Sequence, residues 1–275
     1  MKAYEVLNRL TKAARPTDTW SKGEPYGAYN LSMYQNIDRA VYCVTPTPEV
    51  IAAFKAGKHD VLISHHPYVT DVPQIVLHTA LDCCEGGLND QWRDVLGIKN
   101  ARHFDRNLGW YGQVDPISYK DMYAKISKYI GRAPLGTCFS DIPTIGSVAV
   151  CSGLGGMVES EAFKNTHADC YIMGEGVFHP HWSPFKAQFE VGHTLSEFKP
   201  GMLFLRKHLP EISVYGANRL NDYFGHEVYT TENKGYYTTT PSLAKSEPFK
   251  GITWPEEDGE NYYGYGGKFN YNGAM

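Results

Sequence analysis

The sequence predicts an α/β protein that contains two copies of a β-α-β unit. Short apolar runs alternate with helical patterns, which is typical of parallel strands joined by helices. Two stretches recur in the same order, because residues 58–67 match residues 166–176 and residues 78–82 match residues 193–197. The two matches are separated by nearly the same length of chain, so they indicate an internal duplication.

The first copy lies in the N-terminal part of the chain. Its β-α-β unit should have a right-handed crossover, and its second strand is apolar throughout, as in a parallel strand covered on both faces. The predicted elements are a helix over residues 3–14, a loop or edge strand over 26–34, a strand over 39–44, a helix over 47–56 with a proline in its first turn, and a strand over 60–64.

The second copy repeats this order. Before it, a helix over residues 118–130 has Ser118 as its N-cap and Asp121 three positions later, close to a capping box. The remaining predicted elements are a strand over residues 146–151, a glycine loop over 152–156, a helix over 159–164, a strand over 170–173, a break at 199–201, and a helix over 202–209 that ends at Pro210.

The composition is that of a globular protein and limits the classes of partner. The chain has 275 residues, of which 42% are hydrophobic and 20% charged, enough for one large or two small domains. A formal net charge of −4 gives no reason to expect nucleic acid as a partner. The first residues lack the apolar core of a signal peptide, and no run approaches the roughly 18 apolar residues of a membrane span. We therefore expect a cytoplasmic protein without a membrane partner.

The six cysteines favour reduced thiols over a disulfide framework. They have no Cys-x-x-Cys spacing and lie in or beside apolar segments. Cys83 and Cys84 stand next to a histidine motif and are either a ligand pair or, as we favour, small buried residues.

The C-terminal part of the chain differs in composition from the rest. Eight of the 20 tyrosines lie after residue 222, and few aliphatic residues accompany them. Residues 216–275 therefore cannot build a core of their own. We interpret them as a Tyr/Gly-rich extension that is either partly disordered or lies across the core or a neighbouring subunit.

Histidines and carboxylates at the ends of apolar segments are the candidate site. His65 and His66 end the second strand of the first copy, where open α/β sheets place ligand-binding groups. Because neighbouring strand residues point to opposite faces, the two imidazoles share one centre only if the chain turns there; otherwise each faces a different metal ion.

The repeated His-Thr-x-x-carboxylate motif supplies the other candidate ligands. It places an imidazole and a carboxylate four residues apart, at His78 and Asp82 and again at His193 and Glu197. Taken singly, Asp82 also suits a helix cap or a turn, and Glu197 a solvated acid. As a set with His65 and His66, these nitrogen and oxygen donors suit Zn, Mn, Fe or Ni. Five strong donors exceed the needs of one tetrahedral zinc, so we predict two divalent metal ions with a bridging carboxylate.

The second copy adds further candidate residues for the cleft that would hold this site. Residues 152–156 form either a tight turn that allows close packing, which we favour, or an anion-binding loop. Glu175 and His179 follow the strand of the second copy and are positioned to line the cleft. The Gly-x-Ser-x-Gly pattern is absent, which disfavours a serine hydrolase.

These residues together resemble the Nif-three (NGG-interacting factor three-like) family, whose members are widely named GTP cyclohydrolase I type 2 homologues. The resemblance covers roughly residues 1–212. It is carried by DVLISHHP at residues 60–67, HTALD at 78–82, GGLND at 86–90, AVCSGLGG at 149–156, Gly174-Glu175, and GHTLSE at 192–197. The family's N-terminal Asp-Asn-x-Gly-Leu stretch is not evident at residues 22–27, and the tyrosine-rich tail departs from the family pattern.

The resemblance implies a two-lobed Nif-three-like fold with mixed sheets and a dinuclear metal site between the lobes. The corresponding domain is residues 1–215, with lobes of about 1–110 and 111–215. The resemblance assigns Glu197 as the bridging ligand and a homo-oligomer, typically a hexamer, as the assembly. The implied metal ligands are His65, His66, Asp82, His193 and Glu197.

The function that follows is a metal-dependent hydrolase of the cyclohydrolase or phosphoesterase type. Its substrate would be a nucleotide or a related small molecule, and His78, Glu175 or His179 would transfer protons or orient the substrate. The alternative is a non-enzymatic metal-binding scaffold, metal chaperone or interaction protein.

Overall fold

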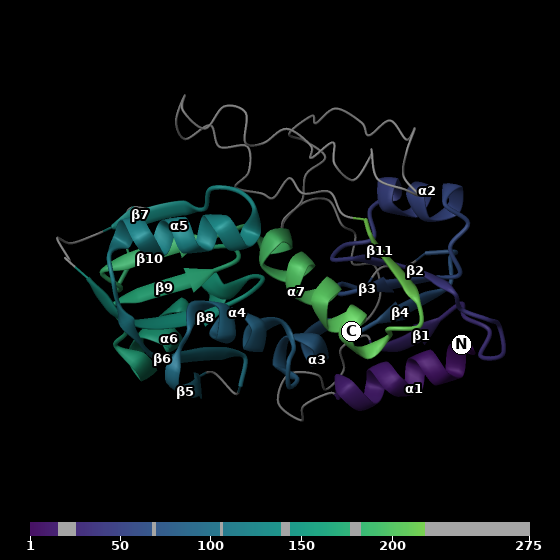
Figure 1. Cartoon of the computed structure of the whole chain (residues 1–275), viewed down its shortest axis with the longest axis horizontal. Coiled ribbons are helices and arrows are strands. Elements are labelled where there is room, and N and C mark those ends of the chain that lie inside the picture. The colour runs from purple at the N-terminus through teal and green to yellow at the C-terminus, as the bar shows by residue number, and fades with distance from the viewer. Residues whose placement is uncertain (16–25, 68–69, 105–106, 139–143, 177–182, 218–275) are drawn as a thin grey trace.

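The protein contains two β-sheets at opposite ends of the molecule (Figure 1). The computed structural model describes residues 1–15, 26–67, 70–104, 107–138, 144–176 and 183–217. His179, the tail after residue 217 and most of residues 22–27 lie outside these ranges, so the predictions for them stay predictions. None of the helices in the described ranges is long and apolar enough to cross a membrane.

The first sheet has five strands in the order β1-β4-β3-β2-β11. Its edge strand β1 is antiparallel to β4, and the other neighbours are parallel. The strands are β1 (Gly27–Tyr29), β2 (Arg39–Cys43), β3 (Val61–Ser64), β4 (Gln74–Val76) and β11 (Ser213–Gly216). Helices α1 (Ala3–Ala13) and α7 (His193–His208) pack on one face of this sheet, and α2 (Pro48–Ala56) packs on the other. Both faces are thus covered, as the apolar strand β3 predicts.

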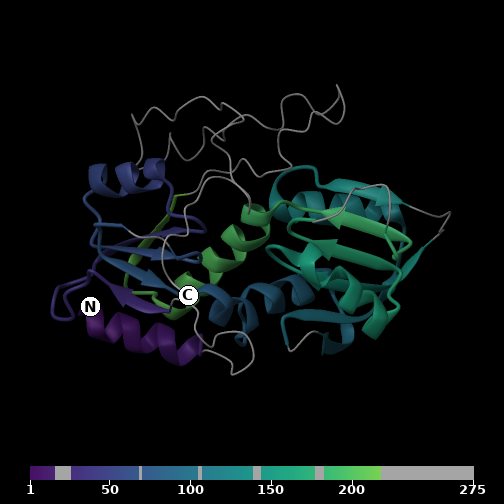
Figure 2. The same ribbon diagram turned by 180° about the vertical axis from the view of Figure 1, so that it is seen from behind.

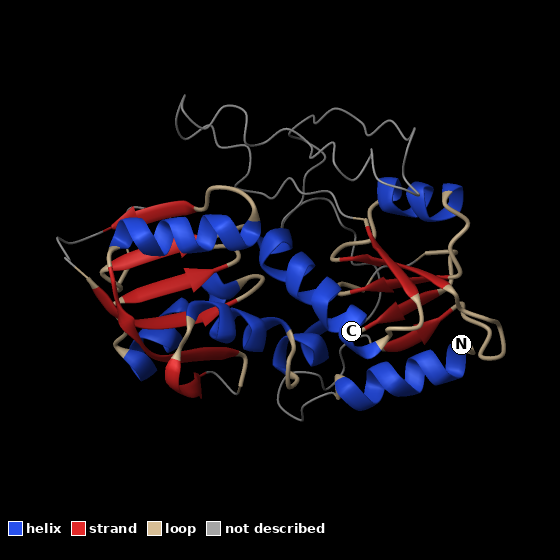
Figure 3. Cartoon of the chain, in the orientation of Figure 1, coloured by secondary structure: helices blue, strands red, loops and turns tan. Residues whose placement is uncertain are grey.

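The second sheet has six strands in the order β5-β6-β8-β9-β10-β7. Its three central strands β8, β9 and β10 are parallel and its outer strands antiparallel. The strands are β5 (Lys99–Phe104), β6 (Gly109–Ile117), β7 (Leu135–Cys138), β8 (Ile145–Cys151), β9 (Cys170–Met173) and β10 (Ala187–Glu190). Helices α4 (Leu88–Leu96) and α5 (Tyr119–Ile130) cover one face, and the 3₁₀ turn η1 (Gly155–Val158) with α6 (Glu159–Thr166) covers the other. Figure 3 shows the helices on both sides of each sheet.

The predicted duplication is confirmed by the topology. The series α1-β1-β2-α2-β3-β4-α3 is repeated as α5-β7-β8-α6-β9-β10-α7. In both series an antiparallel edge strand pairs with the last strand, and the helix that follows begins at the histidine of the repeated motif, His78 in α3 (His78–Cys83) and His193 in α7. The C-terminal ends of equivalent strands therefore present equivalent residues.

Local capping explains where two of the predicted helices begin. The Thr47 hydroxyl accepts a hydrogen bond from the Val50 amide at the start of α2, which also has a proline at its first position. The Ser118 hydroxyl accepts one from the Asp121 amide and donates one to the Asp121 carboxylate. Both helices begin where the sequence predicts them.

The predicted helix break at residues 199–201 is wrong, because α7 runs without interruption from His193 to His208. Proline has no N–H to donate to the carbonyl four residues earlier, which here belongs to Ser196. The indole Nε1–H of Trp92 donates to that carbonyl instead, at 2.8 Å. A side chain from α4 thus supplies the hydrogen bond that Pro200 cannot make, and the helix continues.

The chain crosses between the two sheets more often than a single boundary near residue 110 suggests. Strand β5, which precedes that boundary, belongs to the second sheet, and β11 returns to the first sheet beside β2. Helix α7 connects the two sheets, and Figure 2 shows from behind that it lies between them. The domain boundary at about residue 110 stays a prediction. The sheets do not follow it, because each contains strands from both sides of that residue, the second sheet through β5 and the first through β11.

Candidate metal centre

All five predicted metal ligands come together at the C-terminal ends of the strands. His65 and His66 follow β3, Asp82 lies in α3, and His193 and Glu197 lie one helical turn apart at the start of α7. Their donor atoms form two sets, each gathered within 4.8 Å: His66 with His193 and Glu197, and His65 with Asp82 and Glu197. Glu197 is the residue common to both sets, which is the arrangement that a bridging carboxylate requires.

The distances between donor atoms match those of metal-ligand sets. Bonds of about 2.0–2.1 Å at tetrahedral angles place neighbouring ligand atoms about 3.3 Å apart. His193 Nε2 lies 3.3 Å from Glu197 Oε1 and 3.2 Å from His66 Nε2. In the other set, His65 Nε2 lies 3.4 Å from Glu197 Oε1 and 3.6 Å from Asp82 Oδ2. Glu197 Oε2 is buried without a hydrogen-bond partner among the described residues. The donor set therefore fits divalent metal ions.

The adjacent histidines lie at a local turn after β3, and each belongs to a different set with Glu197. The His65 amide donates to the Cys43 carbonyl and the next amide, of His66, donates to the Val44 carbonyl. The Ser64 hydroxyl then donates to the His66 carbonyl at 2.8 Å. The rings lie 5.0 Å apart, with one imidazole in each ligand set. Both arrangements that the sequence left open stay predictions, because the two imidazoles fall in different sets with Glu197 and also share a set with His78.

Neighbouring polar groups orient the ligands. Glu175 Oε2 lies 2.8 Å from His193 Nδ1, and Thr45 Oγ1 lies 2.7 Å from His66 Nδ1. When these Nδ1 atoms carry the proton, the Nε2 lone pairs point into the cluster, which is the tautomer that a metal ligand needs. The Ser152 hydroxyl donates to Asp82 Oδ1 at 3.4 Å. Glu175 thus lies where the sequence places it, whereas Thr45 and Ser152 were not predicted.

His78 also lies in the cluster. Its ring centroid lies 5.1 Å from that of His65 and 5.5 Å from that of His66, and the three imidazoles form a third set that can hold a metal ion. The side chain is half-buried, in contrast to the buried His65. His78 is therefore positioned either to complete a ligand set or to transfer a proton at the edge of the cluster.

The glycine loop of the second copy packs directly on the Glu197 carboxylate. Gly153 has a positive φ of 60°, and a Cβ at this position would lie 2.2 Å from Glu197 Oε1. The loop amides are already bonded within the protein, since Ser152 N donates to Asn89 Oδ1 and Gly153 N donates to Ser196 Oγ. These contacts favour the tight turn over an anion-binding loop.

Burial and opposite charges shift the pKa values of the cluster in different directions. Burial alone would lower the pKa of His65, but the Glu197 and Asp82 carboxylates raise it above its ordinary value. Burial would raise the pKa of Glu197, yet the imidazoles of His193 and His65 hold it well below its ordinary range. For Asp82, burial prevails and raises the pKa. A cation is therefore favoured beside Glu197, and a divalent ion bound there would replace imidazole protons.

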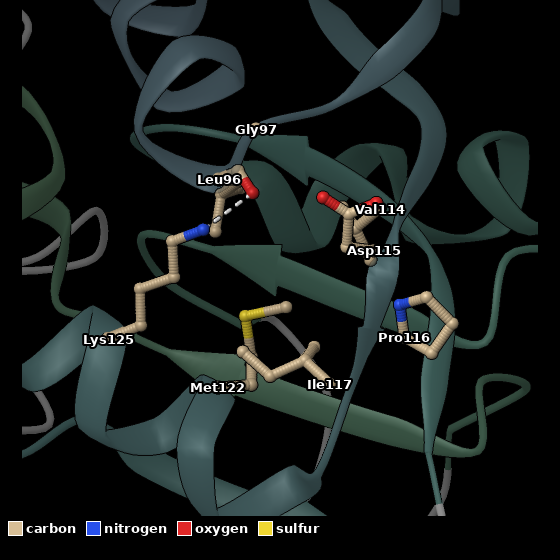
Figure 4. A pocket seen from close by; sticks show the side chains of 8 residues that line it. All are labelled: Leu96, Gly97, Val114, Asp115, Pro116, Ile117, Met122 and Lys125. Atoms are coloured by element: carbon tan, nitrogen blue, oxygen red, sulfur yellow. Dashed lines mark hydrogen bonds between the residues drawn. The ribbon is translucent and has the colours of Figure 1, made fainter.

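A cavity beside the second sheet does not share this chemistry. It has a volume of about 220 Å³ and lies between α4, β6 and α5 (Figure 4). Leu96, Val114 and Met122 give it an apolar lining, and the Lys125 ammonium donates to the Leu96 carbonyl at 2.8 Å. None of its lining residues belongs to the metal-ligand sets.

Named proteins and a family model are similar to this chain in sequence. A family model described as Duf34/NIF3 (NGG1p interacting factor 3) matches residues 69–213, more than half of the chain. A Methanocaldococcus jannaschii protein named GTP cyclohydrolase 1 type 2 homolog is 26% identical over 204 residues, which cover 65% of this chain and 82% of the relative. A Streptococcus pneumoniae protein of the same name is 23% identical over 288 residues, which cover 92% of this chain and 100% of the relative.

Solved structures share the fold. Reduced HcgD from Methanocaldococcus jannaschii superposes with a TM-score of 0.69 at 21% identity, covering 78% of this chain and 97% of that one. The protein ybgI, described as of unknown function, superposes with a TM-score of 0.68 at 21% identity, covering 81% of this chain and 100% of that one. The family match and the shared fold agree, and the chain therefore belongs to the Duf34/NIF3 family.

Proposed function

We propose that the protein is a dinuclear-metal-dependent hydrolase that acts on a nucleotide or a related small molecule. The observation that carries the proposal is the position of Glu197 in both ligand sets. The relatives named GTP cyclohydrolase 1 type 2 homolog support a nucleotide as the substrate class. Zn, Fe, Mn and Ni all suit this mixture of imidazole and carboxylate donors.

In this proposal, each set of residues holds one ion, and the protein side chains orient and protonate the substrate. Two divalent ions would supply Lewis acidity and activate water for attack near neutral pH. Glu175 holds the His193 ring through Nδ1. In this proposal His78, which is half-buried beside the cluster, gives a proton to the leaving group.

A non-enzymatic scaffold, metal chaperone or interaction protein is the second candidate, and the burial of the ligands favours it. His65 is 1% exposed and Glu197 2%, so ions held there would be largely shielded from solutes. In that case the metals would hold the two lobes together without turnover.

Metal-loaded protein assayed against GTP, phosphodiesters and small amides distinguishes the two candidates. We expect turnover of at least one class, its loss in Glu197→Gln, and no loss in Glu161→Gln, an exposed acid of α6 paired with Lys164. Deletion of residues 218–275 should leave the turnover in place. Full metal occupancy without turnover of any substrate would favour the scaffold.

We also propose a homo-oligomer in the cytoplasm, with a hexamer as the assembly that the resemblance implies. Light scattering coupled to size-exclusion chromatography measures the assembly. A monomer at micromolar concentration would contradict it.

A further inference from the structure

Helix α7 holds two of the proposed ligands in a turn whose hydrogen bonding is incomplete. In a regular helix the Ser196 carbonyl accepts from the amide of residue 200, but that residue is Pro200. Ser196 is fully buried, so water cannot reach this carbonyl. A buried carbonyl without a donor costs about 1–3 kcal/mol.

Trp92 supplies the missing donor from a different helix. Its indole Nε1 lies 2.8 Å from the Ser196 carbonyl oxygen. The indole is 1% exposed and packs edge-on against the Tyr129 ring, with centroids 4.9 Å apart. The donor is therefore held in place by packing and has no competing water.

The carbonyl that Trp92 binds lies between the two ligands of α7. Ser196 precedes Glu197 directly and follows His193 by three residues. Its side chain is fixed as well, because Ser196 Oγ accepts from the Gly153 amide at 2.8 Å and donates to the His193 carbonyl at 2.6 Å. A shift of Ser196 would thus move both ligands.

We infer that Trp92 is a positioning residue for the metal centre, whose indole N–H replaces the backbone donor lost at Pro200 and fixes the turn that carries His193 and Glu197. The inference rests on the proposed function, since it assumes that the centre binds metal. It assigns α4, which contributes none of the five proposed ligands, a direct part in ligand geometry.

A double-substitution cycle tests this exchange of donors. Trp92→Phe removes the indole N–H but keeps an aromatic ring. Pro200→Ala gives residue 200 a backbone N–H that can donate to the Ser196 carbonyl. The probes are Zn²⁺ affinity, measured by competition with a chromophoric chelator, and the visible spectrum of bound Co²⁺. We expect Trp92→Phe to weaken Zn²⁺ binding about tenfold or more with Pro200 present, and less than about threefold with Ala at position 200. The Co²⁺ spectrum should change and recover in parallel.

Trp110→Phe is the matched control. Trp110 also donates its indole N–H, to Asp90 at 2.8 Å, but it does not contact α7 through that bond. Its substitution should leave the Zn²⁺ affinity unchanged in both backgrounds.

If Trp92→Phe weakened Zn²⁺ binding equally with proline and with alanine at position 200, only the volume of the indole would matter. That result would overturn the inference. Unchanged affinity in Trp92→Phe, in a protein that does bind Zn²⁺, would overturn it while the proposed function stands. Absence of Zn²⁺ and Co²⁺ uptake by the unsubstituted protein would overturn both. Should Trp92→Phe fail to fold, the inference is tested by the rate of hydrogen exchange of the Trp92 indole proton, compared between the unsubstituted protein and Pro200→Ala. Faster exchange in Pro200→Ala supports the inference, and an unchanged rate overturns it.

Discussion

At the scale of single residues, Glu197 is the residue on which the proposed centre depends most. It is 2% exposed, it belongs to both ligand sets, and its backbone carbonyl accepts a hydrogen bond from the Tyr42 hydroxyl at 3.3 Å. A buried carboxylate is stable only when cations or donors surround it. Here imidazoles of both sets surround it, so its charge depends on their protonation or on metal ions.

We predict that Glu197→Gln loses one metal ion per chain or binds both more weakly, while the fold is retained. A bridging carboxylate offers one oxygen to each ion, whereas an amide has a single good acceptor for a cation. Metal content by mass spectrometry, beside circular dichroism, measures the effect. Glu161→Gln, on the exposed side of α6, is the control. Full occupancy in Glu197→Gln would remove the basis of the dinuclear centre.

Glu190, at the end of β10, gives a pH dependence that does not involve a proposed ligand. Burial, together with the Glu175 and Glu159 carboxylates, raises its pKa to about 7, against the hydrogen bond from the Gly176 amide. The unfolded chain has the ordinary pKa of 4.5. Between these pH values the folded state binds more protons, so the free energy of unfolding falls as the pH rises.

We predict that Glu190→Gln removes this decline, which amounts to about 3 kcal/mol across the window. Urea unfolding of metal-free protein at several pH values between 4.5 and 7 measures it. Glu161→Gln should keep the slope of the unsubstituted protein. Parallel curves for Glu190→Gln and the unsubstituted protein would contradict the raised pKa.

The sequence predicts which residue types form the site better than which residues orient them. Histidines and carboxylates at strand ends, in a repeated spacing, identify the five candidate ligands because few structural roles explain such a set. Thr45, Asn89, Ser152 and Ser196 were not predicted, because common polar residues become significant only through partners distant in sequence. Asn89, for example, accepts from Ser152 N, an amide 63 positions away.

At the scale of elements, the loop after β8 and the helix α7 form one closely packed pair. Gly153 approaches Glu197, and a Cβ at Gly174 would lie 2.3 Å from the Gly153 carbonyl oxygen and 2.5 Å from Ser196 Oγ. Glycine is required by space and by backbone conformation at Gly153, and by space at Gly174, which follows β9. The glycines of this loop therefore preserve the position of the carboxylate.

We predict that Gly153→Ala lowers metal occupancy as well as stability. Both Gly153 and Gly131 have positive φ, at 60° and 85°, so alanine at either position should cost about 1 kcal/mol of backbone strain. Only at Gly153 would the new methyl group displace the Glu197 carboxylate, since a Cβ at Gly131 meets nothing within 4 Å. Metal analysis and chemical denaturation of both variants measure the two effects. Equal occupancy would show that the loop does not constrain the ligand.

Elements with a clear apolar pattern were predictable, and those shaped by tertiary contacts were not. Strands β3, β8 and β9 are buried runs of apolar residues, so their sequences identify them. Strand β6 has only two buried residues in nine, Gly109 and Val114, so its pairing with β8 leaves little pattern. The error at Pro200 has the same origin, because the donor that preserves the helix comes from Trp92.

At the scale of the whole molecule, the five proposed ligands come from elements that follow strands of both sheets. His65, His66 and Asp82 follow strands of the first sheet, whereas His193 and Glu197 follow β10 of the second. Ions bound by both groups should hold the lobes together, because a ligand that binds only the folded state stabilises it.

We predict that chelation of the loaded protein lowers its melting temperature by several degrees. Ions at 100 times their dissociation constant contribute about 2.7 kcal/mol, and each kcal/mol shifts the melting temperature by roughly 2–4 °C in a domain of this size. Calorimetry before and after chelation, with metal added back, measures the shift. An unchanged melting temperature would argue against a centre that joins the lobes.

Chain order determines when this centre can form during synthesis. Domains emerge from the ribosome from the N-terminus at about 5–20 residues per second, so His65, His66 and Asp82 leave the ribosome well before the shared Glu197. Strand β11, which completes the first sheet beside β2, emerges later still. Until Glu197 emerges, a nascent chain has neither its complete first sheet nor the ligand that we propose to bridge two ions. The proposed two-metal centre can therefore be completed only after the second copy of the repeat has emerged from the ribosome.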